Sequence, residues 1–444
     1  MKALMTLTLL LLISGIGVAQ EDKTQDESQQ QAPAAVVVPQ SGSPRGEVPP
    51  ETPGEHGTPA NSVQVGVNVS GSFDSLGNSD RSSGSTVGEG MVFRLNSQSR
   101  NRRTMFEYLP SYSYRTGSGQ AHNFAHALNA DSYFRLGERW NLHLQNGYRL
   151  TTDPFQASSF LPSPEAPNAT LAIPYSKQTS EVANAELNWR ATKRTSVGWV
   201  GNFAMQRYSE TLGFNNAQQG LLDSTNSSGS MYVRYAFTKR FTAGLEAQYQ
   251  DLLIGDSFSR TQSYSAVAYT SIQLTRHSQL TFYGGPLRSH LRNQILLDLG
   301  FFVVPINVVN WNTGATGGAS YSLQMKHSRF YALYSNRITD GGGLMGAVTL
   351  NTASASFDHD FTRLWSGGLG FGFGNNAAIA ANNTLRSYTG TATVRRKLTR
   401  DVNFAISYQN INQEQTPKQF GYLNGNHNRV YASLEYVWTH PLGR

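Results

Sequence analysis

The sequence contains no cysteine among its 444 residues. This absence excludes disulfide bonds, thiolate metal sites and cysteine nucleophiles. It also agrees with export through an oxidising periplasm, where stray thiols are a hazard. Long hydrophobic runs are scarce: the mean hydropathy is −0.40, whereas a helical membrane protein needs several apolar stretches of about 20 residues. A bundle of membrane-spanning helices is therefore excluded.

Motifs for catalysis and cofactor binding are also missing. There is no Walker phosphate loop, HExxH zinc motif or GxSxG elbow, and the ten histidines lack metal-ligand spacing. Gly368, Gly370 and Gly372 form a glycine run, but it lies within an expected strand and does not open a helix, as a dinucleotide site would require. The sequence predicts no catalytic residue, no metal and no cofactor, and hence not an enzyme.

Alternation of apolar and polar residues is the dominant pattern that is present. In Met231–Gln250, Met231 and Val233 alternate with Tyr232 and Arg234, and the same alternation resumes after the basic turn at Lys239-Arg240. Successive side chains of a strand point to opposite faces, so each arm has one apolar and one polar face. The short turn makes the two arms an antiparallel hairpin.

Similar short turns recur along the chain, and a longer loop rich in Gly, Ser and Asn separates each from the next. They lie at Ser99–Thr104, Gly137–Trp140, Thr192–Thr195, Thr275–Ser278, Lys326–Arg329, Thr362–Leu364 and Thr399–Asp401. Short turns at one end and long loops at the other are typical of an up-and-down transmembrane β-barrel. From about residue 62 onward the chain resembles the porin-like outer-membrane barrels of Gram-negative bacteria, and this resemblance points to no individual protein.

Three regions follow from this pattern. Residues 1–19 begin with Lys2, continue with a short apolar core and end in small residues, as a secretory signal peptide does. Residues 20–62 are rich in Gln, Pro and acidic residues, so they cannot bury enough surface to fold, and we expect a disordered periplasmic extension. It is either a spacer, a tether to periplasmic partners or a plug that enters the lumen. Residues 63–444 form the barrel.

The strand number follows from closure. Unpaired backbone groups are too costly in hydrocarbon, so the sheet must close on itself. The eight short turns and the two terminal strands predict about 18 antiparallel strands, with a range of roughly 16 to 20. The range depends on Gly285–Trp311, where the apolar block is continuous. We expect this segment to be a loop, either a constriction inside the barrel or an outer loop against its rim; an extra strand pair is the alternative.

Aromatic residues near strand ends predict the two interfacial belts of a membrane barrel. The residues expected there are Trp140, Trp199, Trp365, Trp438, Tyr249 and Tyr408. The last strand ends in Tyr436 and Trp438, which resemble the carboxy-terminal signal read by the barrel-assembly machinery. The chain departs from that signal because His440–Arg444 continue past the final aromatic residue.

Charged residues at mid-strand must face inward, because ionised side chains are costly against lipid. Counting alternate positions predicts these lumen-facing residues: Arg94, Arg115, Arg149, Arg190, Arg234 and Arg395, with Glu107, Asp131, Glu186, Glu246 and Glu435. They either form a ladder of ion pairs that stiffens the wall, or create a field that selects solutes, favouring anions if the arginines are unpaired.

The leading functional hypothesis is a water-filled outer-membrane channel for passive diffusion of small hydrophilic solutes. The alternatives are a polysaccharide-export barrel in which arginines guide an acidic polymer, and a structural or adhesive barrel without transport. A lipid-modifying enzyme is less favoured, since its nearest candidates, His126 and Ser132, are more simply explained as surface residues. Expected partners are outer-membrane lipid, the barrel-assembly machinery, the solute or polymer, and a second copy in a homo-oligomer. The predicted signal peptide and the lack of a basic aromatic groove argue against nucleic acid.

Overall fold

The structure is a computed structural model that describes residues 61–76, 83–116, 121–152, 176–211, 222–255, 259–298, 303–339, 347–379, 383–416 and 425–442. The expected signal peptide at residues 1–19 and nearly all of the extension at residues 20–62 lie outside these ranges, so both remain predictions. No helix among the described residues is long and apolar enough to cross a membrane.

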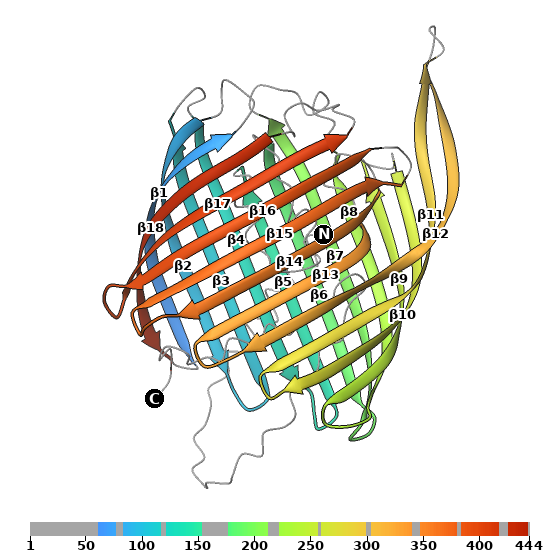
Figure 1. Cartoon of the computed structure of the whole chain (residues 1–444), viewed down its shortest axis with the longest axis horizontal. Coiled ribbons are helices and arrows are strands. Elements are labelled where there is room, and N and C mark those ends of the chain that lie inside the picture. The colour runs from blue at the N-terminus through green and yellow to red at the C-terminus, as the bar shows by residue number, and fades with distance from the viewer. Residues whose placement is uncertain are drawn as a thin grey trace. The chain divides into compact units, whose positions relative to one another are not determined.

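The described chain forms 18 antiparallel strands in one closed sheet (Figure 1). Each strand pairs with the next in sequence, and β1 also pairs with β18, which closes the wall. The predicted barrel and the predicted strand number are therefore confirmed. The strands are β1 Ser62–Leu76, β2 Ser83–Gln98, β3 Arg102–Arg115, β4 Ala121–Arg135, β5 Trp140–Thr151, β6 Ser176–Arg190, β7 Thr195–Thr211, β8 Ser224–Ala236, β9 Phe241–Ile254, β10 Ser259–Thr275, β11 Ser278–Asp298, β12 Val303–Gln324, β13 Ser328–Thr339, β14 Val348–Asp360, β15 Trp365–Ala378, β16 Thr384–Lys397, β17 Val402–Thr416 and β18 Gly425–Pro441.

The two faces of the wall differ as the alternation requires. On β1, Val65, Val67 and Val69 are 43%, 51% and 57% exposed, whereas Gln64 and Ser72, in the opposite phase, are buried. Val65 pairs with Trp438 on one side and Phe93 on the other, so the apolar phase continues from strand to strand. Exposed apolar side chains on one continuous face fit contact with lipid, and the other phase forms the polar inner face.

Four of the eight short turns contain a threonine whose hydroxyl makes two hydrogen bonds with the backbone of the turn. Thr238 Oγ1 accepts hydrogen bonds from the backbone N–H groups of Arg240 (3.1 Å) and Phe241 (3.0 Å). Thr192, Thr362 and Thr399 make the same two bonds to the residues two and three positions later. A hydroxyl that bonds the following backbone stabilises a tight reversal, so threonine, more than the basic residue beside it, shapes these turns.

Replacing Thr238 by valine keeps the shape of the side chain but removes its oxygen, which leaves two backbone donors without this acceptor. We expect a loss of about 1 kcal/mol in the free energy of unfolding, the usual net contribution of such bonds. Urea unfolding of the protein folded in lipid vesicles measures the change. Thr238→Ser keeps the hydroxyl and should match the parent; an equal loss in both variants would contradict the role of the oxygen.

The expectation of a loop at Gly285–Trp311 is wrong. The described part of this segment, residues 285–298 and 303–311, lies in β11 and β12, which pair continuously from Ser278↔Leu323 to Asp298↔Val303. The outer part of this hairpin extends past the neighbouring strands (Figure 1). Beyond its neighbours a strand pair has no lipid face and no lumen face, so nothing there requires apolar and polar residues to alternate.

Pro110 lies inside β3, where a proline is expected either to cause a bulge or to weaken the ladder, and it does not cause a bulge. The register of β2 and β3 is the same on both sides of it, but the ladder is interrupted between Gly90↔Ser111 and Phe93↔Tyr108. The register shifts lie elsewhere, at Ser176/Lys177 and Gln273/Thr275. Proline lacks the N–H that a ladder bond needs, so it weakens one position and leaves the register unchanged.

Three tyrosines on the inner face each lie over a glycine of the adjacent strand. The cross-strand pairs are Gly198↔Tyr232, Gly244↔Tyr269 and Tyr283↔Gly318. A Cβ atom added to any of these glycines would come within 2.1 to 2.6 Å of the tyrosine ring or hydroxyl. The three rings are buried together with Val200 and Val267. Each glycine therefore provides the space that the ring fills.

Candidate channel lining

All eleven predicted lumen residues lie in the inner phase of their strands. Residues that pair across adjacent strands point to the same face. Gln64 pairs with Arg94, and Arg94 pairs with Glu107, so all three lie on the inner face, and the same reasoning applies to the remaining strands. Arg115, Asp131, Arg149, Glu186, Arg190, Arg234, Glu246, Arg395 and Glu435 follow on their own strands. A direct role for these residues with a solute remains a proposal.

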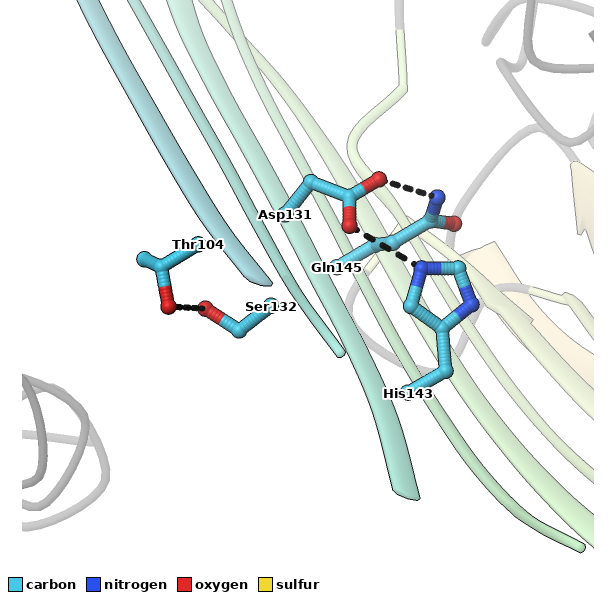
Figure 2. Close-up of polar contacts among 5 residues, drawn as sticks. All are labelled: Thr104, Asp131, Ser132, His143 and Gln145. Carbon is cyan, nitrogen blue, oxygen red and sulfur yellow. Dashed lines mark hydrogen bonds and ion pairs between the residues drawn. The ribbon is translucent and has the colours of Figure 1, made fainter. Parts of the chain in front are cut away.

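Arg94 and Glu107 form an ion pair, and Asp131 contacts two polar side chains of the adjacent strand. Arg94 Nε lies against Glu107 Oε1 on the adjacent strand, and Asn129 Nδ2 donates to Glu107 Oε2 at 3.2 Å. His143 Nε2 lies 3.1 Å from Asp131 Oδ1, and Gln145 Nε2 donates to Asp131 Oδ2 at 3.0 Å. In Figure 2 the group of Asp131, His143 and Gln145 lies apart from the Thr104–Ser132 contact. This part of the lining fits the ladder interpretation.

A second cluster surrounds Tyr232. Its hydroxyl donates to Glu186 Oε1 at 2.5 Å and accepts from Asn188 Nδ2 at 2.6 Å. Arg234, the next inner residue on β8, donates from Nε to Ser196 Oγ at 2.9 Å. Glu246 on β9 pairs across from Tyr232 and is 3% exposed. Neighbouring polar groups therefore hold the side chains of Glu186 and Arg234 on the inner face.

The inner face also carries charged residues that sequence reasoning missed. The additional basic residues are Arg103, Arg135, Arg329, Arg337, Lys397 and Arg429, and the additional acidic ones are Asp74, Asp358 and Asp360. Most lie near strand ends, where the boundaries were uncertain. Extending the alternation by a few residues past each turn would have found them. Among the side chains described on this face, basic groups outnumber acidic ones.

A cluster of carboxamide side chains lines the inner face of β6 to β9. Asn184 donates to Asn202, Asn202 Nδ2 donates to Ser228 Oγ at 3.1 Å, and Gln250 Nε2 donates to Asn226 Oδ1 at 3.1 Å. Asn202, Asn226, Ser228, Gln248 and Gln250 border a pocket whose other side is formed by Arg337, Ile338 and Thr339 of β13. The barrel interior therefore narrows between β13 and the wall formed by β7 to β9.

The candidate residues for a lipid hydrolase do not come together. His126 Nδ1 is hydrogen-bonded to the Tyr108 hydroxyl at 2.9 Å, and Ser132 Oγ donates to Thr104. His126 and Ser132 lie six positions apart on β4, which is roughly 20 Å along a strand. Among the described residues no group of three or more His, Cys, Asp or Glu side chains could hold a metal ion.

Aromatic side chains ring the outer face at the turn end of the strands. Trp140 stacks with Trp189 at 5.8 Å and with Trp199 at 6.3 Å between ring centroids, and Trp140, Trp199, Trp365 and Trp438 are all partly exposed. Tyr249 and Tyr408 are also exposed on the outer face, but they lie within β9 and β17 and not at the ends of these strands, where they were expected. The amphipathic rings at the turn end match one polar boundary of a membrane.

No protein-family model matches the sequence, and no curated protein matches it. Solved structures similar to the chain include OccK5 (OpdH) of Pseudomonas aeruginosa, at 11% identity, 86% and 98% coverage of the two chains and a TM-score of 0.40. OprD of the same organism is similar at 11% identity, with 88% of this chain and 98% of that chain covered and a TM-score of 0.39. OccAB2 of Acinetobacter baumannii is similar at 10% identity, with 85% of this chain and 98% of that chain covered and a TM-score of 0.42. A closed wall of 18 antiparallel strands, apolar outside and polar inside, makes this chain a transmembrane β-barrel of the outer-membrane type.

Proposed function

We propose that the protein is an outer-membrane channel for passive diffusion of small hydrophilic solutes. The observation that carries this proposal is the closed 18-stranded wall with a polar, charged inner face. Barrels of this size leave an aqueous interior unless something fills it. Passive diffusion needs a lining that holds water and no catalytic group, and the inner residues supply such a lining.

The channel is proposed to favour anions. Basic side chains outnumber acidic ones among the described inner residues, and the acids Glu107, Asp131 and Glu186 are already held by neighbouring groups. An excess of positive charge along a narrow pore lowers the energy of an anion inside it and raises that of a cation. The charge and the size of a solute would then decide whether it passes through the channel.

The cellular setting is part of the same proposal. The short turns and both chain ends would lie in the periplasm, with residues 20–62 as a periplasmic extension, and the long connections would face outward. Outer-membrane lipid would contact Val65, Val67 and their equivalents. Tyr436 and Trp438, both exposed on the outer face of β18, would be read by the barrel-assembly machinery. A homo-oligomer remains a prediction.

Conductance across planar lipid bilayers tests the proposal. We expect steady single-channel currents whose reversal potential in a KCl gradient indicates chloride preference. A protein that inserts but carries no current would overturn the channel and favour a structural or adhesive barrel. Currents that only an acidic polysaccharide blocks, without permeation by small solutes, would favour polymer export.

Charge reversal at Arg395 tests the lining itself. Arg395 lies in the inner phase of β16 and is exposed, so Arg395→Glu should shift the reversal potential toward cations. Arg396 is the matched control: it is next in sequence, lies in the outer phase, and its guanidinium stacks on Trp365 at 5.0 Å. Arg396→Glu changes net charge equally but should leave the reversal potential unchanged. Equal shifts in both variants would contradict the assigned faces.

A further inference from the structure

Strands β12 and β13 separate part of the way along the wall. Although β12 begins at Val303, its pairing with β13 covers only Gly317↔Asn336 to Gln324↔Arg329. Within the described residues, the β12 edge from Val303 to Thr316 has no strand partner on that side. Residues 309 to 315 are exposed along this edge. The hairpin stands beyond its neighbours in Figure 1, so its backbone groups are open to another strand.

The end of β13 parts from β12 but stays paired with β14 as far as Thr339↔Val348. Gln250 Nε2 on β9 donates to the carbonyl oxygen of Ile338 at 3.5 Å. Ile338 is 6% exposed and forms a buried apolar cluster with Leu252, Ile254 and Ala347. Three strands separate β13 from β9 in the sheet, so this contact crosses the interior of the barrel. The end of β13 narrows the lumen.

The phase of Ile338 conflicts with its position. It lies in the same phase as Tyr334 and Asn336, and Tyr334 is 49% exposed on the outer face. Leu252 and Ile254, by contrast, lie in the inner phase of β9. A straight continuation of β13 in the wall would therefore turn Ile338 outward toward lipid. An apolar side chain is stable in either place, against lipid or within the cluster.

The free edge of β12 is complementary to the end of β13. Continuing the existing register by three pairs would join Thr316 to Arg337, Ala315 to Ile338 and Gly314 to Thr339, with no shift. Thr316 Oγ1 already donates to the carbonyl oxygen of Asn336 at 2.8 Å, at the point where the strands part. Gly314 and Ala315 are exposed, so no side chain blocks this edge. Pairing there would satisfy backbone groups of both strands.

We propose that the edge of β12 at Gly314–Thr316 is a docking site for the end of β13, Arg337–Thr339, and that this exchange gates the channel. In the narrow state, β13 contacts Gln250 and the apolar cluster. In the wide state, the end of β13 pairs with β12, the adjoining part of β14 moves with it, and the lumen opens between β13 and β7 to β9. The two states exchange the burial of Ile338, and of Ala347 beside the start of β14, for a few ladder bonds, which are contributions of similar size. The proposal rests on the channel function proposed above.

Disulfide trapping tests the gate, because the chain has no cysteine of its own. Ala315→Cys with Ile338→Cys would capture the wide state, in which these residues are direct cross-strand neighbours. Leu252→Cys with Ile338→Cys would capture the narrow state, in which both residues belong to one cluster. The matched control is Ala319→Cys with Tyr334→Cys, a pair already opposite each other in the wall. Mass spectrometry of protein in lipid vesicles measures bond formation, and planar bilayers measure conductance.

We expect oxidation of the 315–338 pair to raise single-channel conductance, oxidation of the 252–338 pair to lower it, and dithiothreitol to reverse both changes. The 319–334 bond should form without a change in conductance. If the control bond forms but the 315–338 bond does not, or if the latter forms with unchanged conductance, the gate is overturned. If neither the parent nor the control protein conducts, the channel function fails instead, and bond formation still reports whether β13 moves.

Discussion

Replacing Arg429 by methionine is expected to lower the free energy of unfolding by about 3–5 kcal/mol, the cost of leaving one member of a buried ion pair without its partner. Arg429 Nε lies 3.2 Å from Asp74 Oδ1, and the two side chains are only 8% and 7% exposed. Arg429 Nη2 also donates to Ser72 Oγ at 3.2 Å. These contacts join β18 to β1 and therefore hold the closing seam of the barrel.

The control for this variant is a second arginine–aspartate pair between adjacent strands. Arg260 contacts Asp251 through two bonds of 2.9 and 2.7 Å, but its side chain is 50% exposed. Exposed pairs contribute little, so Arg260→Met should change stability by no more than about 1 kcal/mol. Urea unfolding in lipid vesicles compares the two variants. Equal losses would show that burial at the seam does not govern the effect.

Replacing Gly285 by alanine is expected to destabilise the barrel by about 1–3 kcal/mol or more, the range for overpacking a site that cannot yield. A methyl group at this position would lie 1.8 Å from the carbonyl oxygen of Ala266 and 3.0 Å from the Cα of Val267. Both neighbours are backbone, so neither can rotate away. The β10–β11 ladder is interrupted here, between Ser265↔Leu287 and Ala268↔Gly284.

Gly284 is the matched control because it is adjacent on the same strand and points to the other face. A methyl group there meets only the carbonyl oxygen of Thr316, at an ordinary 3.7 Å. Gly284→Ala should therefore be neutral or slightly stabilising, since alanine loses less chain entropy than glycine on folding. The heat-modifiable gel shift and urea unfolding measure both variants. A destabilised Gly284→Ala together with a neutral Gly285→Ala would contradict the assigned close approach.

Local patterns were sufficient to predict the wall. Each short turn and each alternating arm is encoded within about ten residues, as in the hairpin around Lys239-Arg240, so the 18 strands could be counted without knowing how they pair. The hairpin of β11 and β12 could not be predicted in this way. Its outer part extends past the neighbouring strands, where neither face has to be apolar, so the alternation that identifies the other strands is lost.

For the candidate lining, too, one property could be predicted from the sequence and another could not. The phase of Arg94 or Glu186 follows from its immediate neighbours, so its face could be predicted. Its partners could not, because Glu186 meets Tyr232 across 46 positions of the chain. Arg429 was missed because the alternating run of the last strand starts only at Val430, whereas β18 begins at Gly425. The polar residues before Val430 show no alternation that would indicate a strand.

The three tyrosine rings over glycines have a consequence for the accuracy of assembly. If one strand slipped by a residue during insertion, the ring of Tyr232 would face Val197 or Trp199 in place of Gly198, and the space it fills would be lost. The same error would displace Tyr269 and Tyr283 from Gly244 and Gly318. The tyrosine–glycine pairs lie between β7 and β8, between β9 and β10, and between β11 and β12. A strand paired in the wrong register would therefore be destabilised at several successive steps of assembly, before β1 pairs with β18 and closes the barrel.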